Sequence, residues 1–109
     1  MIIAYLNGDY APLADVRISP MDRGFLFGDG VYEVIPCYDG KMVDLQYHLE
    51  RLHQSLGGIA LSPPHSDQQL INMLEEIVAR NGAGNLGIYL QITRGVVEKR
   101  QHAFPVHPL

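Results

Sequence analysis

Apolar and polar residues alternate along the chain from Val31 onward, which is the pattern of a β-strand. Val31, Glu33 and Ile35 would share one face of this strand. Tyr32 and Val34 would point to the other face. Since the strand follows a glycine-rich turn, the phenol of Tyr32 is well placed to meet a small ligand.

Turn residues divide the other apolar runs into short strands. Asn7-Gly8-Asp9 and Asp39-Gly40 have the chemistry of hairpin turns. Residues 14–18 are expected to be extended, and a turn over residues 19–22 leads into the glycine-rich stretch. Strands are therefore expected at residues 2–6, 10–12, 31–38, 41–44 and 86–93.

Apolar residues at helical spacing predict two helices in the middle of the chain. Asp44 is expected to cap the first helix, and Gly57-Gly58 to end it. A capping box of Ser66 and Gln69 begins the second, which should end at Asn81-Gly82. The apolar faces consist of Leu45, Leu49, Leu52 and Leu56, then Leu70, Met73, Leu74, Ile77 and Val78. Hairpins followed by grouped helices predict an α+β domain, two helices packed on a mainly antiparallel sheet.

Composition narrows the function classes. The 109 residues suffice for one domain with a modest core. A formal charge of −4 argues against sequence-independent binding of nucleic acid, which requires a basic face. No apolar run approaches the roughly 18 residues of a membrane span, and the N-terminus lacks the features of a signal peptide.

The single cysteine and the histidines argue against a disulfide, a reactive thiol and a zinc site. Cys37 is alone, so it excludes an internal disulfide and fits a reducing cytoplasm. Its place among apolar neighbours in a strand predicts a buried, inert thiol. His53 and His65 lack partners at ligand spacing, so no zinc site is expected.

The glycine-rich stretch before the strand carries a family signature. Residues 22–34 read DRGFLFGDGVYEV, with three glycines in seven positions. On residue types alone, a structural turn followed by an edge strand accounts for them. The whole string, however, resembles the N-terminal signature of the class IV, pyridoxal-phosphate-dependent aminotransferases of fold type IV. That family includes D-amino-acid aminotransferases, branched-chain aminotransferases and aminodeoxychorismate lyase.

Arg51 is the candidate ligand of a phosphate. Taken alone, it is a helical surface arginine paired with a nearby acid. A guanidinium is also a planar, permanently charged donor that grips phosphate with two hydrogen bonds. His48-Leu49-Glu50-Arg51-Leu52 resembles the His-x-x-Arg-Leu helix of the family, and the resemblance implies that Arg51 binds the phosphate of the cofactor.

Arg100 and His102 form a second group of candidate binding residues. Their Arg-x-His spacing sets a permanent cation beside a titratable imidazole, which suits a carboxylate. The segment resembles the D-amino-acid aminotransferase branch, where such a loop comes from the other subunit. The resemblance implies that Tyr32, Arg100 and His102 bind the substrate carboxylate and that the enzyme is a homodimer. Arg94 is expected to be a structural residue at a strand end.

Two lysines are present, and neither is a suitable anchor for pyridoxal phosphate. Lys41 lies in a hairpin turn and Lys99 in the tail, so both should be solvated. Asp29 and Glu33 are expected to be structural. The resemblance places the cofactor lysine in a C-terminal domain beyond residue 109, so residues 1–109 would be the N-terminal domain of a longer protein and would carry no catalytic residue.

The expected function is therefore to bind cofactor phosphate and substrate carboxylate in an aminotransferase, which moves an amino group between a D-amino acid and a 2-oxo acid. Two alternatives stay open. One is aminodeoxychorismate lyase, which shares the fold and cofactor but usually lacks the Arg-x-His loop. The other is a truncated, non-catalytic dimerisation module.

Overall fold

The computed structural model describes residues 1–104, and residues 105–109 lie outside that range. Both sheets are antiparallel: β1 pairs with β2, and the second sheet has the order β4-β3-β5. This arrangement confirms the predicted α+β class. In chain order the elements are β1 (Ile3–Leu6), β2 (Asp9–Pro12), the short 3-10 helix η1 (Leu13–Asp15), α1 (Arg23–Phe27), β3 (Gly30–Tyr38), β4 (Lys41–Met42), α2 (Leu45–Gly58), α3 (Asp67–Arg80) and β5 (Leu86–Thr93).

Both predicted hairpin turns are present. Asn7 and Gly8 have φ of 49° and 102°, and Asp39 and Gly40 have φ of 50° and 75°. Positive φ at both central positions suits the right-handed twist of the flanking strands. Gly40 is also close to its surroundings, since a Cβ there would lie 2.9 Å from the carbonyl oxygen of Ala83.

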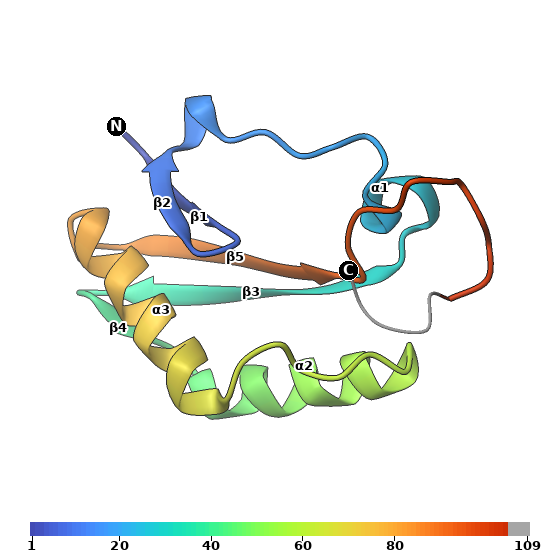
Figure 1. The fold of residues 1–109 in the computed structure, drawn as a ribbon. Coiled ribbons are helices and arrows are strands. Elements are labelled where there is room, and N and C mark those ends of the chain that lie inside the picture. The colour runs from blue at the N-terminus through green and yellow to red at the C-terminus, as the bar shows by residue number, and fades with distance from the viewer. Residues whose placement is uncertain (105–109) are drawn as a thin grey trace.

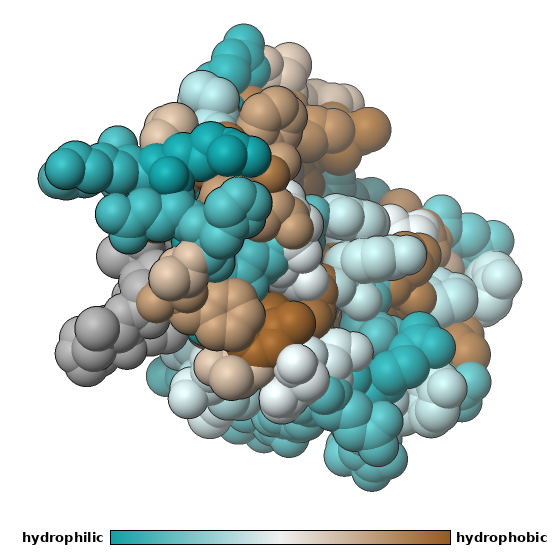
Figure 2. Space-filling model, turned by 90° about the vertical axis from the view of Figure 1, so that its right-hand side faces the viewer, coloured by the Kyte–Doolittle hydropathy of each residue, from teal (hydrophilic) through white to brown (hydrophobic). Residues whose placement is uncertain are grey.

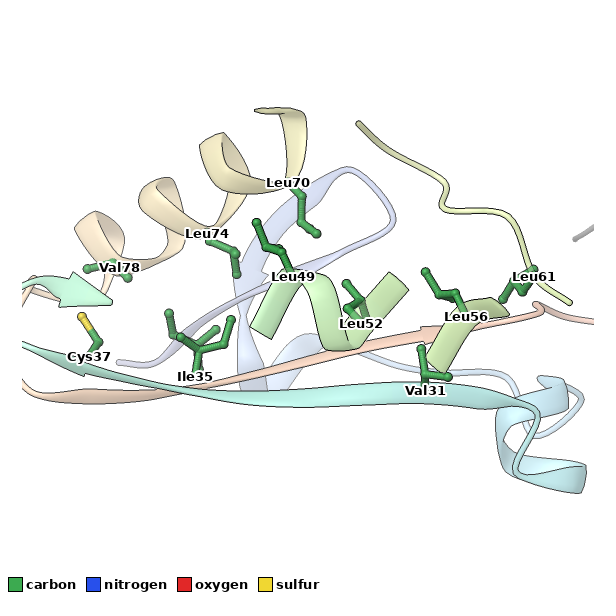
Figure 3. Packing of buried hydrophobic residues seen from close by; sticks show 11 residues of the cluster. Val31, Ile35, Cys37, Leu49, Leu52, Leu56, Leu61, Leu70, Leu74 and Val78 are labelled. Atoms are coloured by element: carbon green, nitrogen blue, oxygen red, sulfur yellow. The ribbon is translucent and has the colours of Figure 1, made fainter. Parts of the chain in front are cut away.

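The core lies between one face of the β4-β3-β5 sheet and the helices α2 and α3, which run along the same side of it (Figures 1 and 3). Val31, Ile35 and Cys37 project from β3 toward these helices, as the alternation predicted. Cys37 is fully buried, as expected. The helices contribute Leu49, Leu52 and Leu56 from α2 and Leu70, Leu74 and Val78 from α3.

The opposite face of the sheet is open among the described residues. Tyr32 and Tyr89 are each more than 60% exposed, and their rings stack with centroids 5.7 Å apart. Val34 pairs with Tyr89 across the two strands and is about half exposed. The sheet therefore has one face in the core and one that presents aromatic side chains.

The helices confirm the predicted positions with one difference, at the N-terminal end of α2. Asp44 does occupy the N-cap position, but its φ is 53° and its side chain makes no capping hydrogen bond. α2 ends at Gly58, so Gly57 and Gly58 mark its C-terminus as predicted, and Ile59 is the C-cap. Neither glycine has a positive φ, and the left-handed residue is Ala60, two positions after the helix, where φ is 54°.

The capping box at the start of α3 is confirmed. The Ser66 hydroxyl accepts from the Gln69 backbone N–H at 3.2 Å, and the Gln69 side chain accepts from the Ser66 N–H at 2.9 Å. At its other end, Asn81 exchanges two hydrogen bonds of 2.9 Å with the backbone of Ile3. This contact ties the β1–β2 hairpin to α3.

Three local predictions were wrong. Strand β4 covers two residues instead of 41–44, because the chain has already turned toward α2 at Asp44. Part of the expected extended segment 14–18 belongs to η1. The glycine-rich stretch contains the helix α1, whose start Asp22 caps by accepting from the Gly24 N–H at 2.8 Å. Within residues 1–104 no helix is long and apolar enough to span a bilayer.

Candidate functional site

Glu33 holds the predicted phosphate ligand, Arg51. The guanidinium of Arg51 donates to both Glu33 carboxylate oxygens, from Nε at 2.8 Å and from Nη2 at 2.8 Å. His48, one turn earlier on α2, places its Nδ1 2.6 Å from the same carboxylate. The His-x-x-Arg spacing therefore aims both side chains at one acid on β3, which is nearly fully buried. We call these three residues the open cluster.

The charges of the open cluster stabilise one another. The hydrogen bonds from Arg51 hold the pKa of Glu33 below its usual value; burial acts in the opposite direction, and His48 adds to the lowering. The hydrogen bond to Glu33 likewise raises the pKa of Arg51. Both groups are therefore charged at neutral pH.

Arg51 also retains donors for a second acceptor. Its side chain is 48% exposed, and Glu33 takes two of its five N–H groups. The Tyr47 ring lies 5.3 Å from the guanidinium and limits its movement on one side. The hydrogen-bond donors of this site suit a phosphate. A half-exposed, planar guanidinium can donate to the Glu33 carboxylate from one edge and to an anion from another.

Tyr32 lies on the other face of the same strand. Its neighbour Glu33 points toward α2, while Tyr32 points to the open face and stacks on Tyr89. Strand β4 pairs only with Cys37 and Tyr38, so no described strand pairs with the first half of β3 on that edge. Tyr32 on β3 and Arg51 on α2 thus lie on opposite sides of the sheet.

Arg100 and His102 are brought together by Phe27 of α1. The Phe27 ring centre lies 4.9 Å from the Arg100 guanidinium carbon and 4.8 Å from the His102 ring centre. Both side chains belong to an exposed loop, residues 95–104, that folds back over α1. Figure 2 shows this end of the molecule, where apolar surface lies among polar side chains. Within residues 1–104, no hydrogen bond, ion pair or ring contact joins either residue to Tyr32.

A second acid-centred group, which the sequence did not reveal, lies beneath that loop. The Asp29 Oδ2 atom accepts from Arg23 Nε at 2.7 Å and from Arg94 Nε at 2.8 Å. The three residues are 7%, 1% and 3% exposed, so two cations and one anion are sealed from water. We call them the closed cluster. The expectation that Arg94 and Asp29 are structural agrees with this placement.

The closed cluster is fully satisfied. Burial alone would raise the pKa of Asp29, but the hydrogen bonds and charges of Arg94 and Arg23 outweigh it, and that pKa lies below its usual value. Arg94 also donates to the carbonyls of Ile59 and Ala60, and the Phe104 ring centre lies 3.8 Å from its guanidinium carbon. In the described part of the chain, no buried side-chain nitrogen or oxygen lacks a partner.

The two lysines behave as predicted. Lys41 begins β4 beside a hairpin turn and Lys99 lies in the loop, and both are exposed. Residues 1–104 also contain no group of three or more His, Cys, Asp or Glu side chains that could hold a metal ion. The candidate site consists of the predicted binding residues on β3, α2 and the 95–104 loop.

The fold and this arrangement define a family. The chain belongs to the class IV amino-transferases, whose family model matches residues 30–107. Within that class, the D-alanine aminotransferase of Staphylococcus epidermidis (strain ATCC 35984) is 38% identical over 109 residues, which is 100% of this chain. The match covers 38% of that relative, so the chain spans about two fifths of its length.

Solved structures agree on the fold. A branched-chain aminotransferase from the archaeon Thermoproteus uzoniensis superposes with a TM-score of 0.77 over 96% of this chain and 36% of its own, at 24% identity. The 4-amino-4-deoxychorismate lyase of Pseudomonas aeruginosa reaches a TM-score of 0.66 over 84% of this chain and 32% of its own, at 28% identity. Both are similar to this chain over about a third of their length.

Proposed function

We propose that this chain is the N-terminal part of a pyridoxal-phosphate-dependent aminotransferase that moves an amino group between a D-amino acid and a 2-oxo acid. The cofactor lysine would lie in a segment that follows residue 109. This chain together with that segment is called the complete protein below. It would act as a cytoplasmic homodimer.

The observation that carries this proposal is the similarity to a D-alanine aminotransferase over the whole chain. The matched part contains the phosphate-binding candidate on α2 and also the Arg100–His102 loop. This loop favours an aminotransferase over aminodeoxychorismate lyase, which usually lacks it. The guanidinium of Arg100 and the imidazole of His102 suit a substrate carboxylate.

Arg51 would hold the phosphate of the cofactor, which when bound supplies the electron sink for the reaction. Glu33 and His48 would keep the guanidinium in place before the phosphate arrives. Preorganisation of this kind lowers the entropy cost of binding, since the side chain is already ordered. It also keeps Arg51 on α2, a rigid element, so that the phosphate defines where the ring of the cofactor lies.

Tyr32, Arg100 and His102 would bind the substrate carboxylate, with the loop of one subunit completing the site of the other. Two observations support a site shared between subunits. The described residues do not join Tyr32 to the loop within one chain, and the exposed side chains of Arg100 and His102 lie against the Phe27 ring. Tyr32 meanwhile faces away from the core on the open face of the sheet.

Aminodeoxychorismate lyase chemistry is the second candidate, favoured by the structural similarity to the Pseudomonas aeruginosa lyase. A steady-state assay separates the two. Under the proposal, the complete protein converts D-alanine and 2-oxoglutarate at a measurable rate and releases no pyruvate from aminodeoxychorismate. The opposite result would replace the aminotransferase with the lyase.

The shared site is tested by complementation. The Arg100→Ala and Tyr32→Phe forms of the complete protein are mixed and allowed to exchange subunits. If the site is shared, each mixed dimer has one site with both residues intact and one with neither, so activity rises above that of either parent. If the site lies within one chain, every site keeps one lesion and no recovery appears. A mixture of Arg100→Ala with itself, treated identically, is the control for the exchange procedure.

A further inference from the structure

Arg23 is the residue in the closed cluster whose contacts reach the candidate site. All three of its side-chain nitrogens have acceptors. Nε donates to Asp29, Nη1 donates to the Gln101 carbonyl at 2.6 Å, and Nη2 donates to the His102 carbonyl at 3.1 Å. A planar guanidinium can address three oxygens at once in fixed directions, which an ammonium cannot do.

Few other contacts hold the loop. At its end, the Phe104 ring centre lies 3.8 Å from the guanidinium carbon of Arg94. An isolated bridge between Asp22 and Val96 and a hydrogen bond from the Val97 N–H to Met21 fix its beginning. From residue 98 to residue 104 every side chain is exposed and the backbone has no regular structure. The hydrogen bonds that join this part to the rest of the described chain are the two from Arg23.

Arg23 also holds the ring on which the loop rests. Its guanidinium carbon lies 4.8 Å from the centre of the Phe27 ring, which in turn contacts Arg100 and His102. Because Asp29, which also accepts from Arg94 at the end of β5, holds Arg23 from the buried side, the position of the loop is tied to the sheet.

We propose that Arg23 is a positioning residue: held by Asp29, it fixes the backbone of Gln101 and His102 and so sets where the side chains of Arg100 and His102 meet the substrate. The inference rests on the proposed function, which assigns the carboxylate to those two side chains. It predicts that loss of the Arg23 fork weakens carboxylate binding, while the groups that hold the cofactor stay in place.

The test compares Arg23→Lys with Arg94→Lys in the complete protein. The two arginines share the Asp29 carboxylate and the same burial, but Arg94 directs its other donors to Ile59 and Ala60. Its contact with the loop is the Phe104 ring, 3.8 Å from its guanidinium carbon, and a lysine cation can also lie against an aromatic ring. Arg23→Lys should raise KM for amino acid and oxo acid alike by about ten-fold, with kcat and cofactor affinity nearly unchanged. Arg94→Lys should leave KM unchanged.

A readout independent of activity follows the loop directly. Trypsin cleaves after Lys99 and Arg100 faster when the backbone of this segment is released from Arg23, so the rate reports the released population. Arg23→Lys should raise the cleavage rate by about ten-fold, and Arg94→Lys should not. Should Arg23→Lys fail to fold, Phe27→Leu removes the ring without changing any charge and carries the same two expectations.

Each outcome has a defined meaning. An unchanged cleavage rate in Arg23→Lys overturns the inference, as does an equal rise in KM for both lysine variants. If Arg100→Ala raises KM and Arg23→Lys does not, the inference is wrong and the proposed function stands. If Arg100→Ala itself leaves KM unchanged, the proposed function is wrong and the inference falls with it, whatever the cleavage rate.

Discussion

The open and closed clusters have the same composition at first sight, because each sets two basic side chains around one carboxylate. They differ in where the basic groups lie. In the open cluster, Arg51 is about half exposed and Glu33 engages one edge of its guanidinium. In the closed cluster, Arg23 and Arg94 are buried and their donors end on carbonyls of the chain.

Because of this difference, the open cluster can accept an anion, whereas the closed cluster can only hold segments of the chain in place. An ion pair with an exposed, partly used guanidinium keeps donors for an anion from solution. A sealed pair has none to spare, and its directional hydrogen bonds instead order the segments whose carbonyls they meet. Acid-centred arginine clusters can therefore have opposite roles at a distance of a few residues along one strand and the turn before it.

The largest expected effect is on stability, from Asp29→Asn in the complete protein. The substitution leaves two buried arginines without a counterion, which should lower the free energy of unfolding by about 3–5 kcal/mol. Glu33→Gln is the matched control in the open cluster and should cost only about 1–2 kcal/mol, because Arg51 can take water as its partner. Urea denaturation followed by circular dichroism measures both. Equal losses would mean that the two clusters do not differ as their burial indicates.

The next effect concerns the cofactor and comes from Arg51→Ala. Removal of a charge-assisted contact should weaken pyridoxal phosphate binding by about ten- to a hundred-fold and, because Glu33 loses its partner, lower the free energy of unfolding about as much as Glu33→Gln does. Arg80→Ala is the control, since Arg80 is an equally exposed helical arginine that pairs with Glu76. Fluorescence titration of the cofactor gives the dissociation constants. An unchanged dissociation constant for Arg51→Ala would mean that Arg51 is an ordinary surface residue.

The smallest effect is the dependence of stability on acid. The pKa of Glu33 is lowered in the folded state by Arg51 and His48, whereas in the unfolded chain it returns to its ordinary value of about 4. The stabilisation is therefore fully present above that value and is lost as pH falls through the folded pKa.

The measurement is the difference in unfolding free energy between the natural protein and Glu33→Gln from pH 6 down to pH 3. That difference should shrink as pH falls, by about 1.4 kcal/mol for each unit by which the pKa is lowered. Other titrating groups are common to both proteins and cancel. A difference that is constant with pH would mean that Glu33 is not held as an ion.

Local patterns accounted for most of the secondary structure. The alternation from Val31 and the Ser66–Gln69 capping box each depend on neighbours within a few positions, and both are present as predicted. Helix α1 escaped prediction because five residues carry no periodicity and its glycine is needed for a close approach. A Cβ on Gly24 would lie 2.4 Å from a methyl carbon of Thr93, a contact between segments far apart in sequence.

The residues of the candidate site also differ in whether the sequence predicted them. Tyr32, Arg51, Arg100 and His102 stand out in the sequence through short motifs. Their partners do not, since Glu33 was expected to be structural and Arg23 had no assigned role. The one available signal for Arg23 was a charge placed among glycine and aromatic residues, six positions before an acid.

The sequence by itself determined the class of fold, the family, and the faces of β3, because these follow from periodicity, turn chemistry and contiguous motifs. Only the tertiary structure decided which charges meet. Asp29 and Arg94 are 65 residues apart, and Glu33 and Arg51 are 18 apart. Alternation states which side of a strand a residue occupies but not what lies opposite it. Burial, which seals Arg23 and Arg94 around Asp29 and leaves Arg51 half exposed beside Glu33, exists only once β3, β5, α1 and α2 are packed together.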